Sequence, residues 1–276
     1  MTGRSTRRYR RLILIAIVAV TVSVAGCSVH RAAARSSPSP TVPTATGPTT
    51  VQQLCDAQPW PRAIPNVIGR LLYQAKDGAL GCYDNINAVA PDGHDPLNRP
   101  AKPAEKTYRI TAVSPAAGTP IGRHDTVMVE LAEVDATQSP VFRPCAWVTA
   151  AEATDILGGP VTAEPIGDQP GSVDVACLYD KPVDVGEGVQ IDLQMPGAFA
   201  VDAGSEFALA TSAPRTTAVD GIGVKTACVN EPTTTPPSTT LVVLLNGDRL
   251  LRITQGYASC TTLKRFAQLA IGRIGA

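Results

Sequence analysis

The first clear pattern along the chain is an apolar run near the N-terminus, over residues 12–24. The run has about 13 residues, a length typical of signal peptides, whereas a bilayer-spanning helix needs about 20. Small residues and Cys27 follow the run, so we predict a signal peptide over residues 1–26. An uncleaved membrane anchor is the alternative. The run is preceded by basic residues and no acidic one: Arg4, Arg7, Arg8, Arg10 and Arg11. This basic flank predicts that the N-terminus stays on the cytoplasmic side of the membrane.

Two polar stretches divide the rest of the chain. Residues 28–50 consist mainly of Ser, Pro, Thr and Ala, and such a segment cannot bury enough apolar surface to offset the entropy lost on ordering. We therefore expect residues 27–53 to form a disordered tether, of a composition that is often O-glycosylated. Residues 133–143 are interpreted as an interdomain linker that allows some freedom. Two candidate domains remain, residues 54–132 and 144–276.

The first candidate domain shows one helical and two strand patterns. Apolar residues recur at helical spacing over residues 70–80. Residues 108–113 are typical of a strand, and residues 114–119 carry the Pro and Gly of a tight turn. Residues 126–131 (TVMVEL) alternate like a half-buried strand. The pattern predicts a small module in which one helix packs on strands.

The second candidate domain opens with a capping box. Thr149 is the predicted N-cap of a helix, and Glu152 is the third residue of that helix. In a capping box the side chain of each of these residues accepts a hydrogen bond from the backbone N–H of the other. An apolar stripe at helical spacing follows, and Gly158 ends the helix.

Strand patterns fill the rest of this domain. Residues 175–179 and 189–195 predict strands. Residues 241–245 and 249–254 flank an Asn-Gly-Asp turn, the strongest short hairpin signal in the chain. An amphipathic helix over residues 263–274 closes the sequence. We expect an α/β sandwich-type domain of antiparallel sheet with flanking helices, which makes the predicted fold class of the chain α+β.

Charge excludes one class of partner. The full chain has 24 Lys and Arg against 24 Asp and Glu, but removal of residues 1–26 leaves 19 basic residues against the same 24 acidic ones. A mildly acidic protein has no electrostatic footprint for nucleic acid or for anionic lipid headgroups. We expect no nucleic-acid partner, and membrane attachment has to come from another source.

Cysteines support an exported protein. The chain has 7 cysteines, and an even number remains when Cys27 is set aside. In an exported chain an even number of cysteines indicates disulfides. No two of these cysteines have the CxxC spacing. The expected pairs are Cys55–Cys82, Cys145–Cys177 and Cys228–Cys260. The last two pairs would each tie the start of a helix to the neighbouring sheet. The alternative is that the two strand cysteines, Cys177 and Cys228, pair across the sheet.

The sequence contains none of the common catalytic or metal-binding motifs. There is no HExxH, GxSxG, P-loop or GxGxxG motif, and no histidine lies in a recognised nucleophile elbow. Asp92, His94 and Asp95 could bind a metal, but a solvated loop is the better interpretation. Paired carboxylates are a spatial feature that sequence spacing does not reveal. We expect no enzyme, no cofactor and no metal, with a hydrolase of unrecognised site as the alternative.

Residues 24–27 (VAGC) resemble the lipobox of bacterial lipoproteins. The resemblance implies that Cys27 is lipidated, with acyl chains such as palmitate, and that the mature chain starts there. It further implies attachment to the cell membrane on its extracytoplasmic face.

Two further resemblances concern the domains. Residues 65–69 (PNVIG) and the later SPAAGT…VMVEL pattern look like a PASTA domain over about residues 64–131, which implies a β-α-β-β module that in relatives is associated with peptidoglycan binding. This copy departs from the family in being single, in a Pro-rich insertion over residues 90–104, and in carrying two cysteines. The opening PCxxxTxxEAxxxLG and the later Cys177-Leu178-Tyr179 resemble an actinobacterial lipoprotein domain of unknown function, and the arrangement is similar to sensor domains of mycobacterial kinases.

These observations converge on a function outside the cytoplasm. We expect a non-enzymatic, membrane-anchored envelope lipoprotein that acts as an extracytoplasmic sensor, accessory subunit or binding module. The expected partners are the membrane, through lipidated Cys27, and an envelope protein or a peptidoglycan fragment. Peptidoglycan binding through the PASTA-like domain is the alternative.

Overall fold

The computed structural model describes residues 47–275, apart from 99–106, 135–141, 182–187 and 236. All described residues belong to one compact unit of the chain. The predicted signal peptide, Cys27, most of the tether, the middle of the linker and part of the Pro-rich insertion lie outside the described residues. No helix in the described part of the chain combines the length and apolar character that crossing a bilayer requires.

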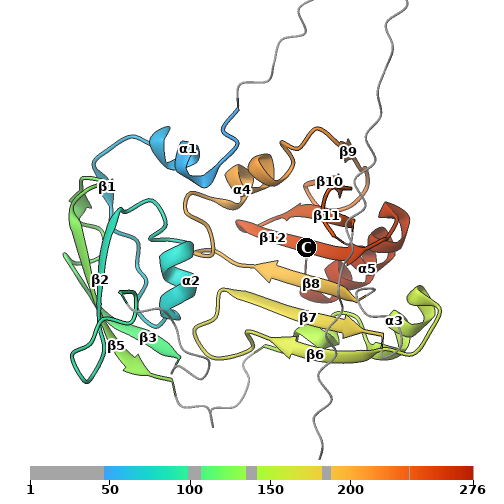
Figure 1. Ribbon diagram of the computed structural model, residues 1–276, viewed down its shortest axis with the longest axis horizontal. Helices are drawn as coiled ribbons and strands as arrows, with labels where there is room; N and C mark the ends of the chain where they lie inside the picture. Colours follow the sequence, from blue (N-terminus) through green and yellow to red (C-terminus); the bar gives the residue numbers. More distant parts are fainter. Residues whose placement is uncertain (1–46, 99–106, 135–141, 182–187, 236, 276) are drawn as a thin grey trace, which may run out of the picture. The chain divides into compact units, whose positions relative to one another are not determined.

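The N-terminal lobe, residues 51–133, contains a three-stranded sheet (Figure 1). Its elements are α1 (Val51–Asp56), β1 (Arg62–Ala63), α2 (Leu72–Asp77), β2 (Asn85–Val89), β3 (Tyr108–Ser114), β4 (Pro120–Ile121) and β5 (Thr126–Glu133). Strand β5 lies in the middle of the sheet, parallel to β2 and antiparallel to β3. Alternate residues of β5 are buried, among them Val127 and Val129, and pack with Leu72 of α2. The alternation predicted for residues 126–131 is thus present.

Helix α2 is shorter than the predicted residues 70–80. Leu71 has extended backbone, and its N–H donates to Gly171 O at 3.3 Å. At the other end Gly78 closes the helix, and its N–H donates to Gln74 O. Because Leu71 is extended and bonds to Gly171, and Gly78 ends the helix, the apolar spacing continues beyond the helical backbone.

Helix α1 lies partly inside the predicted tether, which was expected to extend to residue 53. The Thr50 side chain caps the helix by accepting from the Gln53 N–H at 3.2 Å. Cys55, 1% exposed, pairs with Cys82 and so holds this helix on the lobe. A cap and a covalent bond to a buried residue order a stretch whose composition alone predicted disorder.

The C-terminal lobe, residues 144–275, is built on a seven-stranded antiparallel sheet of order β6-β7-β8-β12-β11-β10-β9. The strands are β6 (Thr162–Ile166), β7 (Asp174–Asp180), β8 (Val189–Gln194), β9 (Thr216–Ala218), β10 (Lys225–Glu231), β11 (Ser238–Leu245) and β12 (Arg249–Gly256). The hairpin predicted around the Asn-Gly-Asp turn is the β11–β12 pair. Strands β6 and β9 were not predicted, because their short polar sequences lack the alternation that marks a half-buried strand.

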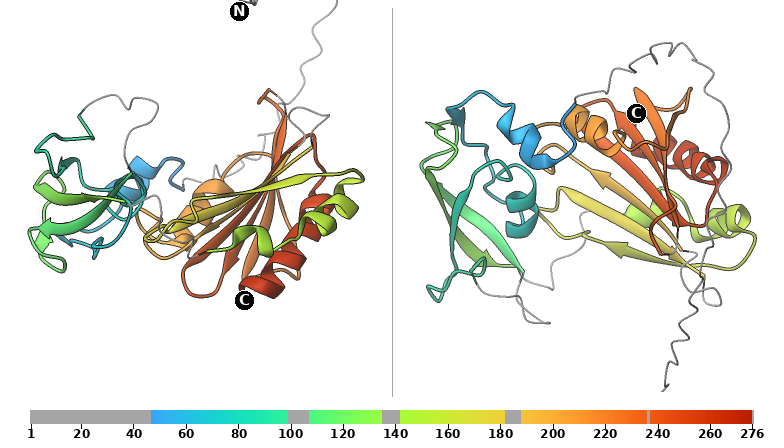
Figure 2. Two further views of the ribbon diagram at one scale, coloured as in Figure 1. Left: turned by 90° about the horizontal axis from the view of Figure 1, so that it is seen from below. Right: turned by 45° about the horizontal axis from the view of Figure 1, so that its top comes forward.

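Helices flank this sheet on both faces (Figure 2). The 3-10 turn η1 (Pro144–Ala146) precedes α3 (Ala150–Leu157), which together with α5 (Cys260–Ile274) covers one face. Phe266 of α5 packs there against Tyr179, whose hydroxyl donates to Val148 O at 2.6 Å. Helix α4 (Ala203–Ala210) lies on the opposite face, which we term the outer face. Mixed helices with mostly antiparallel sheets confirm the predicted α+β class.

The predicted capping box is confirmed. The Thr149 side chain accepts from the Glu152 N–H, and the Glu152 carboxylate accepts from the Thr149 N–H at 2.8 Å. The same carboxylate accepts two bonds from Arg273 of α5, at 2.6 and 2.7 Å. These bonds lower the pKa of Glu152 to about 2 and join α3 to α5 on the sheet face opposite the outer face.

Three disulfides cross-link the described residues. Their Cα–Cα distances are 5.2 Å for Cys55–Cys82, 5.0 Å for Cys145–Cys177 and 6.1 Å for Cys228–Cys260. The alternative pairing of Cys177 with Cys228 across the sheet is therefore not the one present.

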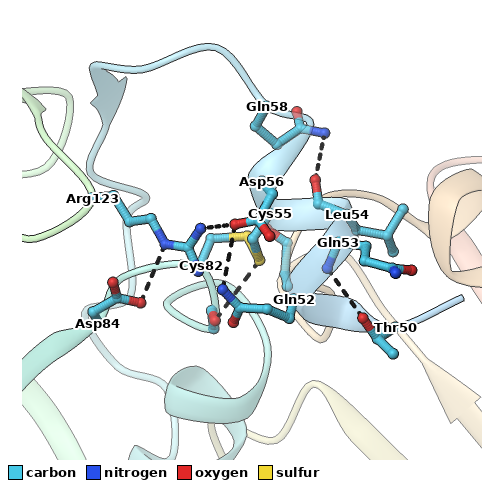
Figure 3. Close-up of a disulfide and its surroundings, with 12 residues drawn as sticks. Thr50, Gln52, Gln53, Leu54, Cys55, Asp56, Gln58, Cys82, Asp84 and Arg123 are labelled. Atoms are coloured by element: carbon cyan, nitrogen blue, oxygen red, sulfur yellow. Dashed lines mark hydrogen bonds and ion pairs between the residues drawn. A yellow bond between two sulfur atoms is a disulfide. The ribbon is translucent and has the colours of Figure 1, made fainter. Parts of the chain in front are cut away.

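Figure 3 shows the first disulfide beside Arg123, whose guanidinium donates to Asp84 at 3.2 Å and contacts the carboxylate of Asp56. This network fastens α1 to the loop before β5.

Candidate functional site

A glutamine side chain of α2, Gln74, forms two of the hydrogen bonds that join the lobes. The Val173 N–H donates to Gln74 Oε1 at 2.7 Å, and Gln74 Nε2 donates to Asp174 O at 3.0 Å. Asp174 is the first residue of β7, and Val173, which is buried, directly precedes it. One amide thus replaces the sheet partner that this piece of backbone lacks, and it fixes α2 of one lobe against β7 of the other.

Glycines allow the two backbones to come together beside this glutamine. A Cβ on Gly78 would lie 2.7 Å from the carbonyl of Ala198, so only glycine fits there. The next residue, Ala79, donates its N–H to Gly197 O at 3.2 Å. The sequence predicted some freedom between the domains, whereas the structure shows hydrogen bonds and close backbone packing between the lobes.

A polar pocket lies where the lobes meet. Its volume is about 190 Å³, and its lining comes from α1, α2, β7, β8 and α4. The lining residues are Val51, Gln74, Asp77, Gly78, Asp174, Gln194, Ala198, Ala200 and Glu206. Three of them, from both lobes, carry carboxyl groups, and we term this cavity the acidic pocket.

The acidic pocket continues onto a polar row of the outer sheet face. Asp174 of β7 lies opposite Gln194 of β8, and Gln194 Nε2 donates to the Asp174 carboxylate at 3.2 Å. Two residues earlier on β8, Asp192 lies opposite Arg252 of β12 and accepts from Gln190 Nε2 at 2.6 Å. Strand pleating places all these side chains on the face that α3 and α5 leave free.

Burial shapes the electrostatics of this row. It raises the pKa of Asp192 to about 6, with the charge of Asp174 adding to the rise and Gln190 and Arg252 opposing it. Burial likewise raises the pKa of Asp174. Arg252 Nη1 lies 3.7 Å from the Glu206 carboxylate, so its charge is shared between the row and the pocket. The row therefore loses negative charge as pH falls through about 6, and Arg252 offsets part of the charge that remains above it.

One acceptor in the pocket lining lacks a partner. The Oε1 atom of Gln194 is shielded from solvent and forms no hydrogen bond. A buried polar atom without a partner costs about 1–3 kcal/mol, and a ligand donor that reaches it would recover part of that energy.

The arrangement suits recognition of hydrogen-bond donors and positive charge. Carboxylates and amide oxygens accept from ammonium, hydroxyl and amide groups. No histidine, serine or cysteine lines the acidic pocket, and Asp192 is not among its lining residues, so a nucleophile with an adjacent base is not assembled there. Across the described part of the chain, no cluster of His, Cys, Asp and Glu has the geometry to hold a metal ion.

The residues weighed from the sequence lie elsewhere. The six paired cysteines are in disulfides outside the acidic pocket. His94 contacts the carboxylate of Asp92, while Asp95 accepts from the Leu97 N–H at 2.8 Å as a loop would require. Cys27 lies outside the described residues. Sequence reasoning missed the acidic pocket because its carboxyl groups come from separate lobes.

Comparisons with known proteins leave the family open. Neither the family models nor the curated proteins nor the solved structures gave a match to this chain.

Proposed function

We propose that this protein is a lipid-anchored envelope lipoprotein, attached through Cys27 on the extracytoplasmic face of the cell membrane, that binds a small polar ligand as a sensor or accessory subunit. The acidic pocket carries this proposal, because it is a polar cavity assembled from both lobes. A ligand there would contact α2, β7 and α4 at once. Ligand binding would then strengthen the contact between the lobes, and a partner protein in the envelope could respond to that change.

The ligand class follows from the lining. Asp77, Asp174 and Glu206 supply carboxyl oxygens, and Gln194 supplies an unpaired acceptor. A volume of about 190 Å³ is below that of a drug-sized site and suits the end of a side chain rather than a whole molecule. The proposed ligand therefore presents an amine at the end of a flexible chain, as the peptide part of some peptidoglycan fragments does.

A binding role is favoured over an enzyme by the same residues. Glycoside hydrolysis needs two carboxyl groups that face one substrate bond. Asp174 lines the acidic pocket and Asp192 does not, although both lie on the outer face. The three carboxyl groups that line the pocket, those of Asp77, Asp174 and Glu206, have no histidine, serine or cysteine beside them, and we assign them to ligand recognition.

Titration calorimetry tests the proposal on the full-length protein in detergent. The first probe is a muropeptide with a free side-chain amine, and the second is the same muropeptide with that amine acetylated. We expect saturable binding of the first probe and at least 10-fold weaker binding of the second, because acetylation removes the charge that pairs with the carboxylates. Equal binding of both probes, or binding of neither, contradicts the proposal.

Variants locate the site and separate it from the alternative. Glu206→Gln should weaken binding of the amine probe about 10-fold, since it removes one charged acceptor from the lining. Glu164→Gln, on the exposed edge strand β6, is the matched control and should bind as the unaltered protein does. If binding survives Glu206→Gln and hydrogen exchange slows only within β3 and β5, the ligand site is the surface of the PASTA-like domain instead.

A further inference from the structure

A second cavity at the junction of the lobes has the opposite chemistry. Its volume is about 320 Å³, and it shares only Ala200 with the acidic pocket. Its lining is Arg62, Ala63, Pro65, Asn66, Arg70, Ala79, Tyr83, Pro196, Gly197, Phe199, Ala200, Val201 and Asp248. We term it the arginine groove, because two guanidinium groups are its main charged elements.

Arg62 is held in the groove by aromatic residues. Its guanidinium carbon lies 5.7 Å from the centroid of the Trp60 ring, and Trp60 packs edge-on against Tyr83 with centroids 5.4 Å apart. Tyr83 is itself fixed, since its hydroxyl donates to Ala63 O at 2.9 Å. The Nη1 atom of Arg62 is shielded from solvent and has no hydrogen-bond partner. The Arg62 guanidinium is therefore held in place with an N–H donor that is not in use.

Arg70 approaches the groove through a space that only glycine leaves open. Its Nη1 donates to Pro196 O at 2.8 Å. A Cβ on Gly197 would lie 1.3 Å from that nitrogen, so any side chain at this position would occupy the place of the guanidinium. The backbone of the C-terminal lobe is thus shaped around the Arg70 head group.

Neither guanidinium is neutralised by the protein. Within the described residues, no carboxylate forms an ion pair with Arg62 or Arg70. The one acidic residue of the lining, Asp248, uses its carboxylate to accept from the Ala203 N–H at 2.7 Å. Two partly buried guanidinium groups that form no ion pair, one of them with an idle N–H donor, constitute a built site for an anion.

We infer that the arginine groove binds the carboxylate or phosphate group of a small organic anion, with Arg62 and Arg70 as its ligands. Guanidinium groups match both of these oxyanions through paired N–H donors. The apolar part of the lining, Pro65, Phe199 and Val201, favours an anion attached to a partly apolar body over a free inorganic ion. The inference does not rest on the proposed function, because the groove and the acidic pocket share only one lining residue.

The test measures anion binding to the full-length protein in detergent by calorimetry. The probes are muramyl dipeptide for a wall carboxylate, glycerol 3-phosphate for a lipid headgroup and inorganic phosphate. The methyl ester of muramyl dipeptide serves as the uncharged control. We expect saturable binding of at least one organic anion, weakening as ionic strength rises, and no binding of the ester. The organic anion that binds most tightly identifies the source of the ligand.

Variants decide which residues hold the anion. Arg62→Gln and Arg70→Gln should each weaken binding of that anion about 10-fold or more, and Arg62→Lys should restore part of the loss because it returns the charge without the fork. Arg265→Gln, on the exposed face of α5, is the matched control. Thermal unfolding of each variant checks that it is folded. The inference is overturned if no organic anion binds, if inorganic phosphate alone binds, if the ester binds as tightly as its parent, or if Arg265→Gln has the same effect as Arg62→Gln.

Discussion

Asp192 shows how burial on a sheet face changes the behaviour of a single residue. Its carboxyl group lies on the outer face of β8, with Asp174 nearby and Gln190 Nε2 donating to it at 2.6 Å. Burial raises its pKa from 3.8 to about 6, so the folded state favours the protonated form. The associated stability is fully present below pH 3.8 and is lost as pH rises through about 6.

Asp192→Asn tests this at the residue scale. The variant cannot ionise, so it avoids the cost that the unaltered protein meets above pH 6. We expect its free energy of unfolding to gain about 2 kcal/mol relative to the unaltered protein between pH 4 and pH 8. Urea unfolding at both pH values measures the change, and Asp220→Asn, an exposed site, is the control. A difference that does not vary with pH shows that Asp192 is not shifted.

At the scale of elements, features that depend on neighbouring residues were predictable, and features that depend on distant parts of the fold were not. The capping box of α3 and the Asn-Gly-Asp hairpin depend on neighbouring residues, so the sequence carries them completely. Helix α2 was predicted too long because Leu71 bonds to Gly171 of the other lobe, which no local pattern reveals. Strand β6 contains Pro165 and exposed polar residues, and it forms because β7 offers a free edge.

The capping box makes a prediction of its own. Thr149→Ala removes the acceptor for the Glu152 N–H and should lower the free energy of unfolding by about 1 kcal/mol. Thr261→Ala, an exposed substitution in the first turn of α5, is the matched control and should change little. Urea unfolding measures both variants. Equal effects of the two substitutions mean that the cap does not stabilise α3.

The Cys55–Cys82 disulfide is expected to hold helix α1 in place. Helix α1 has 6 residues, too few to persist without tertiary support. Replacing Cys55 and Cys82 by serine should lower the free energy of unfolding by about 3 kcal/mol and speed hydrogen exchange in α1. Exchange in α5, held by a different disulfide, serves as the internal reference. Unchanged protection of α1 would show that Arg123 and the Thr50 cap hold it alone.

At the scale of the whole molecule, the candidate site could not have been predicted from the sequence. The acidic pocket needs Asp77 from one lobe and Asp174 and Glu206 from the other. The residues that bring them together are a glutamine and two glycines, types that carry no chemical signature in a sequence. What the sequence did predict, the disulfides and the α+β class, defines the framework on which this site is built.

The proposed binding site depends on the two lobes meeting in a defined way. Hydrogen exchange at the Val173 amide in the full-length protein tests it most directly, because this N–H donates to Gln74 of the other lobe. We predict slow exchange that becomes at least 10-fold faster in Gln74→Ala, as loss of a buried hydrogen-bond partner costs about 1–3 kcal/mol. Gln268→Ala, exposed on α5, should leave the rate unchanged. Exchange at Val173 as fast as in an unstructured peptide, with or without Gln74, would contradict the account.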